Sequence, residues 1–199
     1  MPAHASVHPV DKETWRTRLL PARAELSAEA RAARDAALTT GALRLAGEVL
    51  GPICAYVPVG SEPGGPTLVS TLVAAGHEVL LPVVPGARGP LEWARFDGTF
   101  ARGPLGLREP TGVRLGVEAI GTAALVFVPG LAVDRRGVRL GRGAGYYDRS
   151  LPFATAPLVM LLDDDELVER LPAEPHDHLV TAALVPKAGL VTLGKTDRP

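Results

Sequence analysis

The chain has 199 residues, 46% of them hydrophobic, and its 21 basic and 22 acidic residues leave a formal net charge of −1. A near-neutral chain lacks the overall positive charge of a nucleic-acid-binding domain, and no apolar run approaches the roughly 18 residues that a membrane-spanning helix needs. The single cysteine, Cys54, excludes an internal disulfide and a thiolate zinc cluster. We therefore expect a small charged metabolite as partner, and neither nucleic acid nor a membrane.

The length favours one domain over residues 1–199, in which residues 1–10 and 186–199 are loosely held. The N-terminal segment has no apolar stretch behind basic residues, as a secretory signal would have. A cytoplasmic location is therefore expected, and a lone cysteine fits a reducing compartment. We expect Cys54 to be a small buried hydrophobic residue on a strand.

The first part of the chain predicts two helices followed by a β-α-β unit. Alanine, leucine, arginine and glutamate recur at helical spacing over residues 12–50, and Ser27 is a plausible cap that divides this stretch into two helices. The unit that follows has a strand at 53–59, a helix at 66–75 and a strand at 78–84. Such a unit implies parallel strands joined by a right-handed crossover.

The patterns in the rest of the chain are shorter. Residues 91–96 predict a short strand pair that lies over the sheet, and the glycine- and proline-rich residues 98–116 predict no regular structure. The elements expected beyond them are strands at 123–128, 158–162 and 179–184 and short helices that begin at Tyr146 and span 164–171. Together these elements predict an α/β fold with a mostly parallel open sheet and helices on both faces.

Three glycines at alternate positions, Gly141, Gly143 and Gly145, follow the predicted strand at 123–128 and lead directly into Tyr146. Glycine adopts backbone conformations closed to other residues and lets an anion approach the peptide N–H groups, and a helix beginning at Tyr146 would direct its N-terminus at the same anion. The segment matches neither the Walker A pattern nor the dinucleotide-binding pattern. The sequence thus predicts a phosphate-binding loop, although the same glycines could simply form the turns of two hairpins.

The segment from Val128 to Asp148 resembles the signature V-P-G-L-A-x-D-x-x-G-x-R-L-G-R-G-x-G-Y-Y-D of the 5-formyltetrahydrofolate cyclo-ligase family. Lys12 and Arg16 have the family's K-x-x-x-R spacing, and Glu62 follows the first strand. Further matches are residues 106–110 with G-I-x-E-P and residues 171–177 with L-P-x-x-x-H-D, so that the resemblance covers about residues 12–185.

The sequence departs from the family pattern at three positions. Ala144 stands where many members have lysine or glycine, and Thr181 and Val185 replace an aspartate and a threonine in the last strand. If a lysine at position 144 neutralises phosphate charge in some members, Arg139 and Arg142 have to supply that charge here, which arginine can do through its fixed fork of donors.

The resemblance implies the fold type of ribose-phosphate isomerases and glucosamine-phosphate deaminases. It also implies an enzyme, a ligase that uses ATP and Mg²⁺ to convert 5-formyltetrahydrofolate, with or without added glutamates, to 5,10-methenyltetrahydrofolate. ADP and phosphate are released, and the reaction passes through a phosphorylated formyl group, an imidate phosphate. Such chemistry needs alignment and charge stabilisation rather than covalent catalysis by the protein.

The resemblance further implies the residues of the site. Arg142 and Tyr146 are the expected catalytic residues, and Asp148 and Asp177 are the expected magnesium ligands. The folate is expected to contact Val57, Glu62 and Trp93. The nucleotide is expected to contact the first helix and the glycine-rich loop through Lys12, Arg16, Arg139, Leu140, Gly141, Arg142, Gly143, Ala144, Gly145, Tyr146 and Tyr147.

Several of these residues also have a purely structural interpretation. Lys12 and Arg16 could lie on a solvated helix surface, and Asp148 could compensate the dipole at a helix N-terminus. Glu62 could be a solvated loop acid, and Trp93 could belong to the core.

Charged residues before the glycine-rich loop and histidines around Asp177 lie close in sequence to the expected site residues. Asp134 is expected to brace the hairpin before the glycines, and the two arginines after it are expected to be exposed charges. His176 and His178 flank Asp177, but one tight cluster lacks the further ligands that zinc needs. A hard cation such as Mg²⁺ is therefore preferred at Asp177.

Two other functions remain open at the level of the sequence. Ala144 and the altered last strand are compatible with a folate- or nucleotide-binding relative that has lost catalysis. A sugar-phosphate isomerase or deaminase could share only the fold, because a fold does not fix its chemistry.

Overall fold

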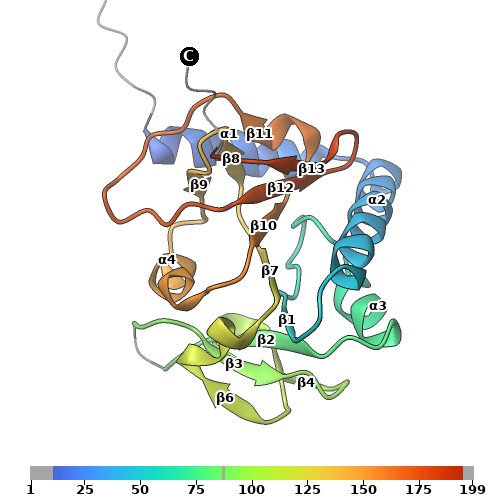
Figure 1. Ribbon diagram of the computed structural model, residues 1–199. Helices are drawn as coiled ribbons and strands as arrows, with labels where there is room; N and C mark the ends of the chain where they lie inside the picture. The colour runs from blue at the N-terminus through green and yellow to red at the C-terminus, as the bar shows by residue number, and fades with distance from the viewer. Residues whose placement is uncertain (1–10, 87, 195–199) are drawn as a thin grey trace, which may run out of the picture.

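The computed structural model describes residues 11–86 and 88–194 (Figure 1). Two helices come first, α1 (Lys12–Glu25) and α2 (Ala28–Gly47). The side chains of Asp11 and Ser27 cap them, because they accept the backbone N–H groups of Thr14 at 2.8 Å and Ala30 at 3.1 Å. The two predicted helices and the cap at Ser27 are confirmed. Within the described residues, no helix is both long and apolar enough to cross a bilayer.

An eight-stranded sheet with the order β13-β12-β10-β7-β1-β2-β3-β6 forms the centre of the molecule. The five strands from β12 to β2 are parallel, whereas β13, β3 and β6 each pair antiparallel with their inner neighbour. The predicted mostly parallel sheet is confirmed. The bounds are β1 (Ile53–Cys54), β2 (Val79–Val83), β3 (Glu92–Arg95), β6 (Arg114–Gly116), β7 (Leu125–Val128), β10 (Leu158–Leu161), β12 (Ala182–Val185) and β13 (Gly189–Thr192).

Helical segments cover both faces of this sheet. Successive strand residues point to opposite faces, so Ile53 and Phe127 pack beneath α2 and α3 (Leu68–Ala74), which lie together at the right of Figure 1. Cys54 and Val128 pack on the other face, against η2 (Val117–Thr122) and η3 (Leu151–Phe153). Cys54 is fully buried on β1, as expected, and its burial raises the pKa of the thiol.

A small sheet of β11 (Leu167–Val168), β8 (Ala132–Asp134) and β9 (Arg139–Leu140) carries the hairpin that precedes the glycines. The fully buried carboxylate of Asp134 accepts the backbone N–H groups of Arg136 (2.9 Å), Val138 (3.0 Å) and Leu171 (3.0 Å). Asp134 therefore braces the hairpin, as expected. Arg136 is not simply an exposed charge, because its guanidinium pairs with Asp134 at 2.6 Å.

Three predicted elements differ from the structure in the first half of the chain. The strand expected at 53–59 ends at Cys54, one residue before the last ladder bond, from Ala55 to the carbonyl of Leu80 at 3.0 Å. Pro58 has no N–H group with which to extend the ladder. The strand at 91–96 is β3, which belongs to the central sheet instead of lying over it. Residues 98–116 are not irregular, since they form β4 (Phe100–Arg102), η1 (Pro104–Gly106), β5 (Arg108–Pro110) and β6.

One prediction in the second half is also wrong. Residues 164–171 do not form a helix, because only η4 (Asp164–Glu166) forms and the next two residues pair with β8 as β11. Part of the segment after 185 forms β13, which pairs antiparallel with β12. Residues 195–199, like residues 1–10, lie outside the described residues, and the expectation of loose ends stays a prediction.

Candidate active site

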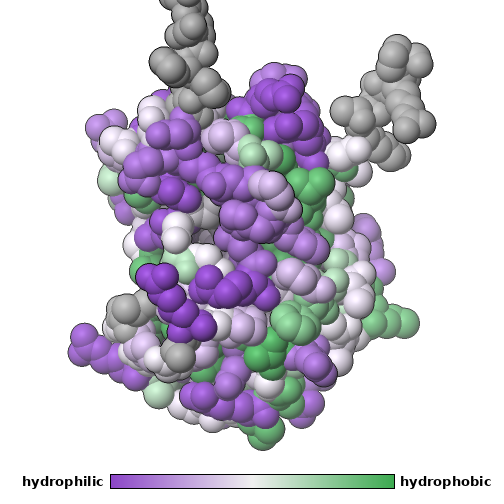
Figure 2. Space-filling view, turned by 90° about the vertical axis from the view of Figure 1, so that its left-hand side faces the viewer, coloured by the Kyte–Doolittle hydropathy of each residue, from purple (hydrophilic) through white to green (hydrophobic). Residues whose placement is uncertain are grey.

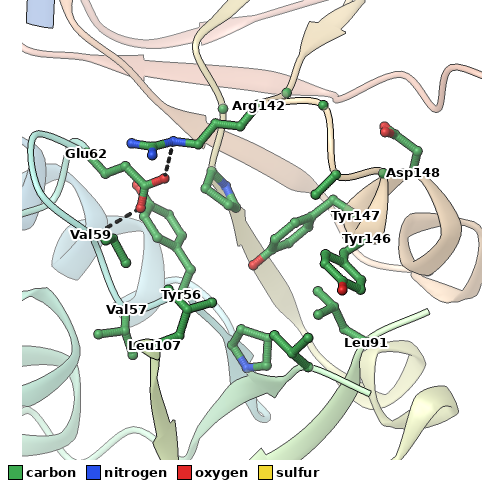
Figure 3. Close-up of a pocket in the computed structure, with 18 of the residues that line it drawn as sticks. Tyr56, Val57, Val59, Glu62, Leu91, Leu107, Arg142, Tyr146, Tyr147 and Asp148 are labelled. Carbon is green, nitrogen blue, oxygen red and sulfur yellow. Dashed lines mark hydrogen bonds and ion pairs between the residues drawn. The ribbon is translucent and has the colours of Figure 1, made fainter. Parts of the chain in front are cut away.

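A cavity of about 250 Å³ lies at the carboxyl ends of β1, β2 and β7 (Figure 3), the edge where parallel α/β sheets usually bind ligands. One wall comes from the loop after β1 and the opposite wall from the glycine-rich loop and α4 (Tyr146–Ser150). The residues that line the cavity include Tyr56, Val57, Glu62, Leu91, Leu107, Arg139, Gly141 to Tyr147 and Asp148. Two loops distant in sequence thus face each other across one space.

The glycine-rich loop keeps its shape only because of its glycines. Gly143 and Gly145 have φ values of 105° and 72°, a region that other residues rarely adopt. A Cβ atom on Gly141 would lie 2.9 Å from Nη1 of Arg139. The loop therefore has no side chain at three alternate positions directly before α4.

Helix α1 lies against this loop through Arg16, whose Nε donates to the carbonyl of Gly141 at 3.0 Å. Lys12 lies one turn earlier and contacts the segment near the C-terminus instead, with Nζ 2.7 Å from Asp177 and 2.6 Å from Glu174. Burial opposes the charge on Lys12, but these two hydrogen-bonded carboxylates outweigh it and raise its pKa. The ligating atoms of Glu174, His176 and Asp177 lie within 4.8 Å of one another, but the ammonium group of Lys12 already serves both carboxylates.

Arg139 and Asp148 form an ion pair at the other end of the loop. The Arg139 side chain is only 3% exposed, donates to the carbonyl of Pro129 at 3.2 Å and lies over the ring of Tyr147, 5.7 Å from its centroid. Asp148 is 32% exposed, so its carboxylate can reach a ligand in the cavity. An oxygen donor in this position suits Mg²⁺.

Glu62 and Arg142 connect the two walls of the cavity. The Glu62 carboxylate accepts the N–H group of Val59 at 2.9 Å and pairs with Nε of Arg142 at 3.0 Å, as Figure 3 shows. Arg142 is 44% exposed, and hydrophilic residues cover most of the upper and central part of the face that carries α4 (Figure 2). The opening of the cavity is therefore polar, whereas its interior is mainly apolar.

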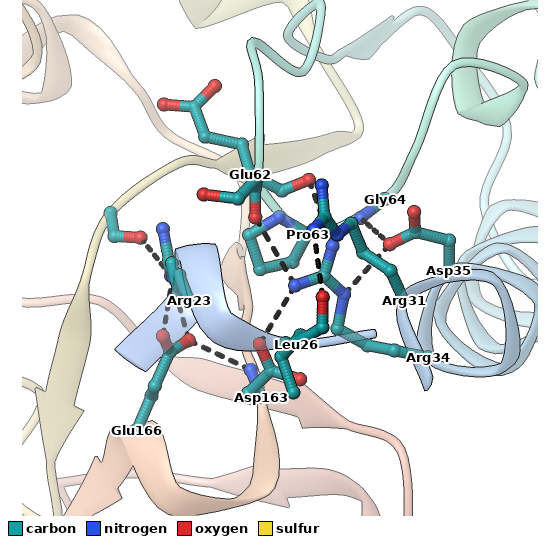
Figure 4. Close-up of polar contacts among 12 residues, drawn as sticks. Arg23, Leu26, Arg31, Arg34, Asp35, Glu62, Pro63, Gly64, Asp163 and Glu166 are labelled. Carbon is teal, nitrogen blue, oxygen red and sulfur yellow. Dashed lines mark hydrogen bonds and ion pairs between the residues drawn. The ribbon is translucent and has the colours of Figure 1, made fainter. Parts of the chain in front are cut away.

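A network on α2 holds the loop that carries Glu62 (Figure 4). The buried guanidinium of Arg34 donates to the backbone carbonyls of Ser61 at 3.2 Å and Glu62 at 3.4 Å, and it pairs with Asp163 at 2.9 Å. Asp35 accepts the N–H group of Gly64 at 3.2 Å. The position of Glu62 thus depends on side chains that do not reach the cavity.

A second buried ion pair lies beside this network, between Arg23 on α1 and Glu166, at 2.5 Å. Arg23 also donates to the carbonyl of Gly130, which lines the cavity, at 2.6 Å. Burial raises the pKa of Glu166, and the pairing with Arg23 opposes that shift. Together the two networks hold the loops after β1 and β7, both of which line the cavity.

Comparison with known proteins identifies the family. The model of the 5-formyltetrahydrofolate cyclo-ligase family matches residues 8–186. The chain belongs to this family. A curated relative from Mycolicibacterium smegmatis named 5-formyltetrahydrofolate cyclo-ligase is 45% identical over 194 residues, which cover 93% of this chain and 98% of the relative. A relative of the same name from Escherichia coli is 32% identical over 126 residues, 60% of this chain and 69% of the relative.

Solved structures of the cyclo-ligase fold agree with this assignment. The NMR structure of Aquifex aeolicus 5,10-methenyltetrahydrofolate synthetase superimposes with a TM-score of 0.74 at 26% identity and covers 94% of this chain and 95% of that one. The Mycoplasma pneumoniae 5,10-methenyltetrahydrofolate synthetase has a TM-score of 0.68 at 18% identity and covers 87% of this chain and 97% of that one, a likeness of fold alone.

Most, but not all, of the site residues expected from the cyclo-ligase signature come together. The cavity wall includes Val57, Glu62, Asp148 and all of Arg139 to Tyr147 except Leu140, which is buried in a separate core cluster. Trp93 is fully buried on β3 and does not line the cavity, so the structure does not bring it together with the other expected site residues. Asp177 contacts Lys12 rather than Asp148.

The sequence reasoning missed cavity residues outside the signature. Tyr56 stands within the apolar stretch that was predicted as a strand, so nothing local marked it as a cavity residue. Its hydroxyl donates to the carbonyl of Pro63 at 2.6 Å. Glu109 is buried at the cavity wall and accepts the N–H group of Val84 at 2.8 Å. The match of residues 106–110 to the family was the available signal for Glu109.

Proposed function

We propose that the chain is an active cyclo-ligase that converts 5-formyltetrahydrofolate to 5,10-methenyltetrahydrofolate with ATP and Mg²⁺, releasing ADP and phosphate. The observation that carries this proposal is the cavity itself. Its glycine-rich wall, with Arg139 and Arg142, suits a polyphosphate, and the facing wall, with Val57 and Glu62, suits a neutral ring with N–H donors. The reaction needs these two ligands next to each other.

The nucleotide is assigned to the glycine-rich wall. The N–H groups of Gly143 to Tyr146 and the guanidinium groups of Arg142 and Arg16 offer donors that phosphate oxygens accept. Arg139 is 3% exposed and paired with Asp148, so it needs to leave that partner to join them. Lys12, one turn before Arg16 on the same helix, needs to leave its carboxylate partners to join them. If a lysine at position 144 neutralises phosphate charge in some members, Arg139 and Arg142 supply that charge here, because Ala144 has none.

The folate is assigned to the wall with Val57 and Glu62. Val57 offers an apolar surface, and the Glu62 carboxylate can accept N–H groups of the pterin. Because Arg142 pairs with Glu62 at 3.0 Å, the two substrates meet where these side chains meet. That arrangement brings the formyl oxygen of the folate toward the terminal phosphate of the nucleotide.

The reaction follows from this alignment. The formyl oxygen attacks the γ-phosphorus, and the bond to the β,γ-bridging oxygen breaks to release ADP. N10 of the folate then adds to the activated carbon and loses its proton, and inorganic phosphate leaves with the former formyl oxygen. Arg142 and Tyr146 are the proposed catalytic residues, because both line the cavity where negative charge spreads over the transferring group.

Asp148 is the residue that we propose to hold Mg²⁺. Its carboxylate lines the cavity and is partly exposed, and a bound Mg²⁺ neutralises charge on phosphate oxygens. Asp177 is assigned a different role, because both of its carboxylate oxygens accept hydrogen bonds from Lys12, at 2.7 and 2.9 Å. It positions Lys12 beside the loop.

One assay tests the proposed function. Purified protein is mixed with Mg-ATP and 5-formyltetrahydrofolate, and near-ultraviolet absorbance of the methenyl product is followed together with phosphate release. We expect both signals to rise in equal amounts. Binding of both ligands without turnover would favour a non-catalytic relative, and failure to bind either ligand would favour an unrelated activity on the same fold.

The variant Asp148→Asn tests the magnesium assignment. We expect it to fold normally and to lose most turnover, with Asp165→Asn, an exposed acid without an ion pair among the described residues, as the matched control. Unchanged turnover of Asp148→Asn at limiting Mg²⁺ would contradict the assignment.

A further inference from the structure

The hydroxyl group of Tyr147 is buried and has no hydrogen-bond partner among residues 11–86 and 88–194. Buried polar groups in folded proteins almost always have a partner, and an exception calls for an explanation such as a ligand. Tyr147 is the second residue of the short helix α4, and no backbone carbonyl among the described residues accepts a hydrogen bond from its hydroxyl.

The hydroxyl group lies at the cavity and not in the packed core. Tyr147 lines the cavity, and Figure 3 shows its ring between Tyr146 and Tyr56, with the hydroxyl end directed toward the side of Tyr56. The ring itself packs against the core cluster that contains Ile120 and Leu151, and the guanidinium of Arg139 lies over it. The ring is therefore held on the nucleotide side, while its hydroxyl end reaches toward the folate wall.

The neighbouring tyrosine does not have this property. The hydroxyl of Tyr56 is buried too, but it donates to the carbonyl of Pro63 at 2.6 Å and so serves the protein's own loop. The other side chains on this part of the wall, such as Leu91, Leu107 and Val57, are apolar. Among the described residues, a ligand that enters here finds a buried hydroxyl donor without a partner, next to these apolar side chains.

We propose that the Tyr147 hydroxyl donates a hydrogen bond to a carbonyl oxygen of the bound folate. This inference rests on the proposed function, and it moves Tyr147 from the nucleotide to the folate side of the site. A phosphate oxygen is the poorer acceptor here, because the arginines and the glycine N–H groups already serve the phosphates and Glu62 places a negative charge on the facing wall. A neutral carbonyl fits beside an apolar surface.

The variant Tyr147→Phe tests the proposal, with folate and ATP binding measured separately by calorimetry. We expect the affinity for 5-formyltetrahydrofolate, measured without ATP, to fall about tenfold and the affinity for ATP to stay within about twofold. The melting temperature of the variant is expected to equal or exceed that of the wild type, because no hydrogen bond within the protein is lost. The same measurement with tetrahydrofolate, which lacks the formyl group, shows whether the formyl or the pterin carbonyl is the acceptor.

Tyr56→Phe is the matched control, since it removes a hydroxyl that already has a partner. Its melting temperature is expected to fall, because the carbonyl of Pro63 loses its donor. Equal folate affinity of Tyr147→Phe and wild type would overturn the inference alone, as would equal losses for folate and ATP together with a lower melting temperature. Absence of turnover in a wild-type protein that still binds folate would overturn the proposed reaction alone.

Discussion

Replacing Arg34 by alanine removes the side chain that holds the Glu62 loop on α2. The guanidinium is 3% exposed and partners two carboxylates, of Asp35 (16% exposed) and Asp163 (21% exposed). Loss of one member of a buried ion pair costs about 3–5 kcal/mol. Because both carboxylates can reach water, we expect the lower end, a loss of about 3 kcal/mol in the free energy of unfolding.

The same substitution also leaves the backbone carbonyls of Ser61 and Glu62 without a donor. The Glu62 loop should then loosen, so that KM for the folate rises about tenfold while KM for ATP changes little. Urea unfolding and steady-state kinetics measure the two effects. Arg44→Ala, an exposed arginine on the same helix, is the control and should lie within about 0.5 kcal/mol of wild type. A variant Arg34→Ala with unfolding free energy and folate KM both at wild-type values would refute the reasoning.

Three further changes test other parts of the structure. Gly143→Ala forces alanine to a φ of 105°, at a cost of about 1–3 kcal/mol, so ATP affinity should fall while folate affinity is retained; calorimetry showing equal ATP affinity would contradict the loop assignment. Asp134→Ala leaves three N–H groups without their acceptor and should lower the unfolding free energy by about 3 kcal/mol; a loss below about 1 kcal/mol in urea unfolding would argue against the brace. Asp11 has a pKa below its ordinary value of 3.8, because it accepts the N–H of Thr14. The stabilisation that the ionised Asp11 carboxylate gives the folded state is therefore present above pH 3.8 and lost as pH falls through the lowered pKa. Asp11→Asn does not titrate, so it should lose less unfolding free energy than wild type on acidification; parallel plots of unfolding free energy against pH would contradict this.

The signature loop could be predicted because its information is local. Glycine permits the positive φ found at Gly143 and Gly145 without help from distant residues, and the caps at Asp11 and Ser27 likewise act within three residues. The apolar run at 123–128 has no competing pattern, so β7 followed.

The missed elements depend on partners far away in the sequence. The capping pattern of Asp163 and Glu166 does begin a helical turn, but Glu166 is committed to the buried Arg23, 143 residues earlier, and the next residues pair with β8. Strand β6 is only three residues long and exists because β3 lies beside it. Such pairings leave no periodicity in the local sequence.

Trp93 and Tyr147 show the same limit within the site. A tryptophan on a short strand suits both stacking and core packing, and its full burial on β3 follows from a sheet position that the sequence did not give. Tyr147 stood within the signature, but only the folded cavity reveals that its hydroxyl is buried without a partner among the described residues. The sequence shows which side chain stands at each of these two positions, but it does not show whether that side chain points into the core or into the cavity.

The most direct measurement for the account is a crystal structure of the protein with Mg²⁺ and a non-hydrolysable ATP analogue. We predict that the phosphates lie against the N–H groups of Gly143 to Tyr146, within hydrogen-bond reach of Arg142, and that the ion contacts Asp148. A triphosphate bound anywhere outside the glycine-rich wall would contradict the central claim that the two facing loops align nucleotide and folate.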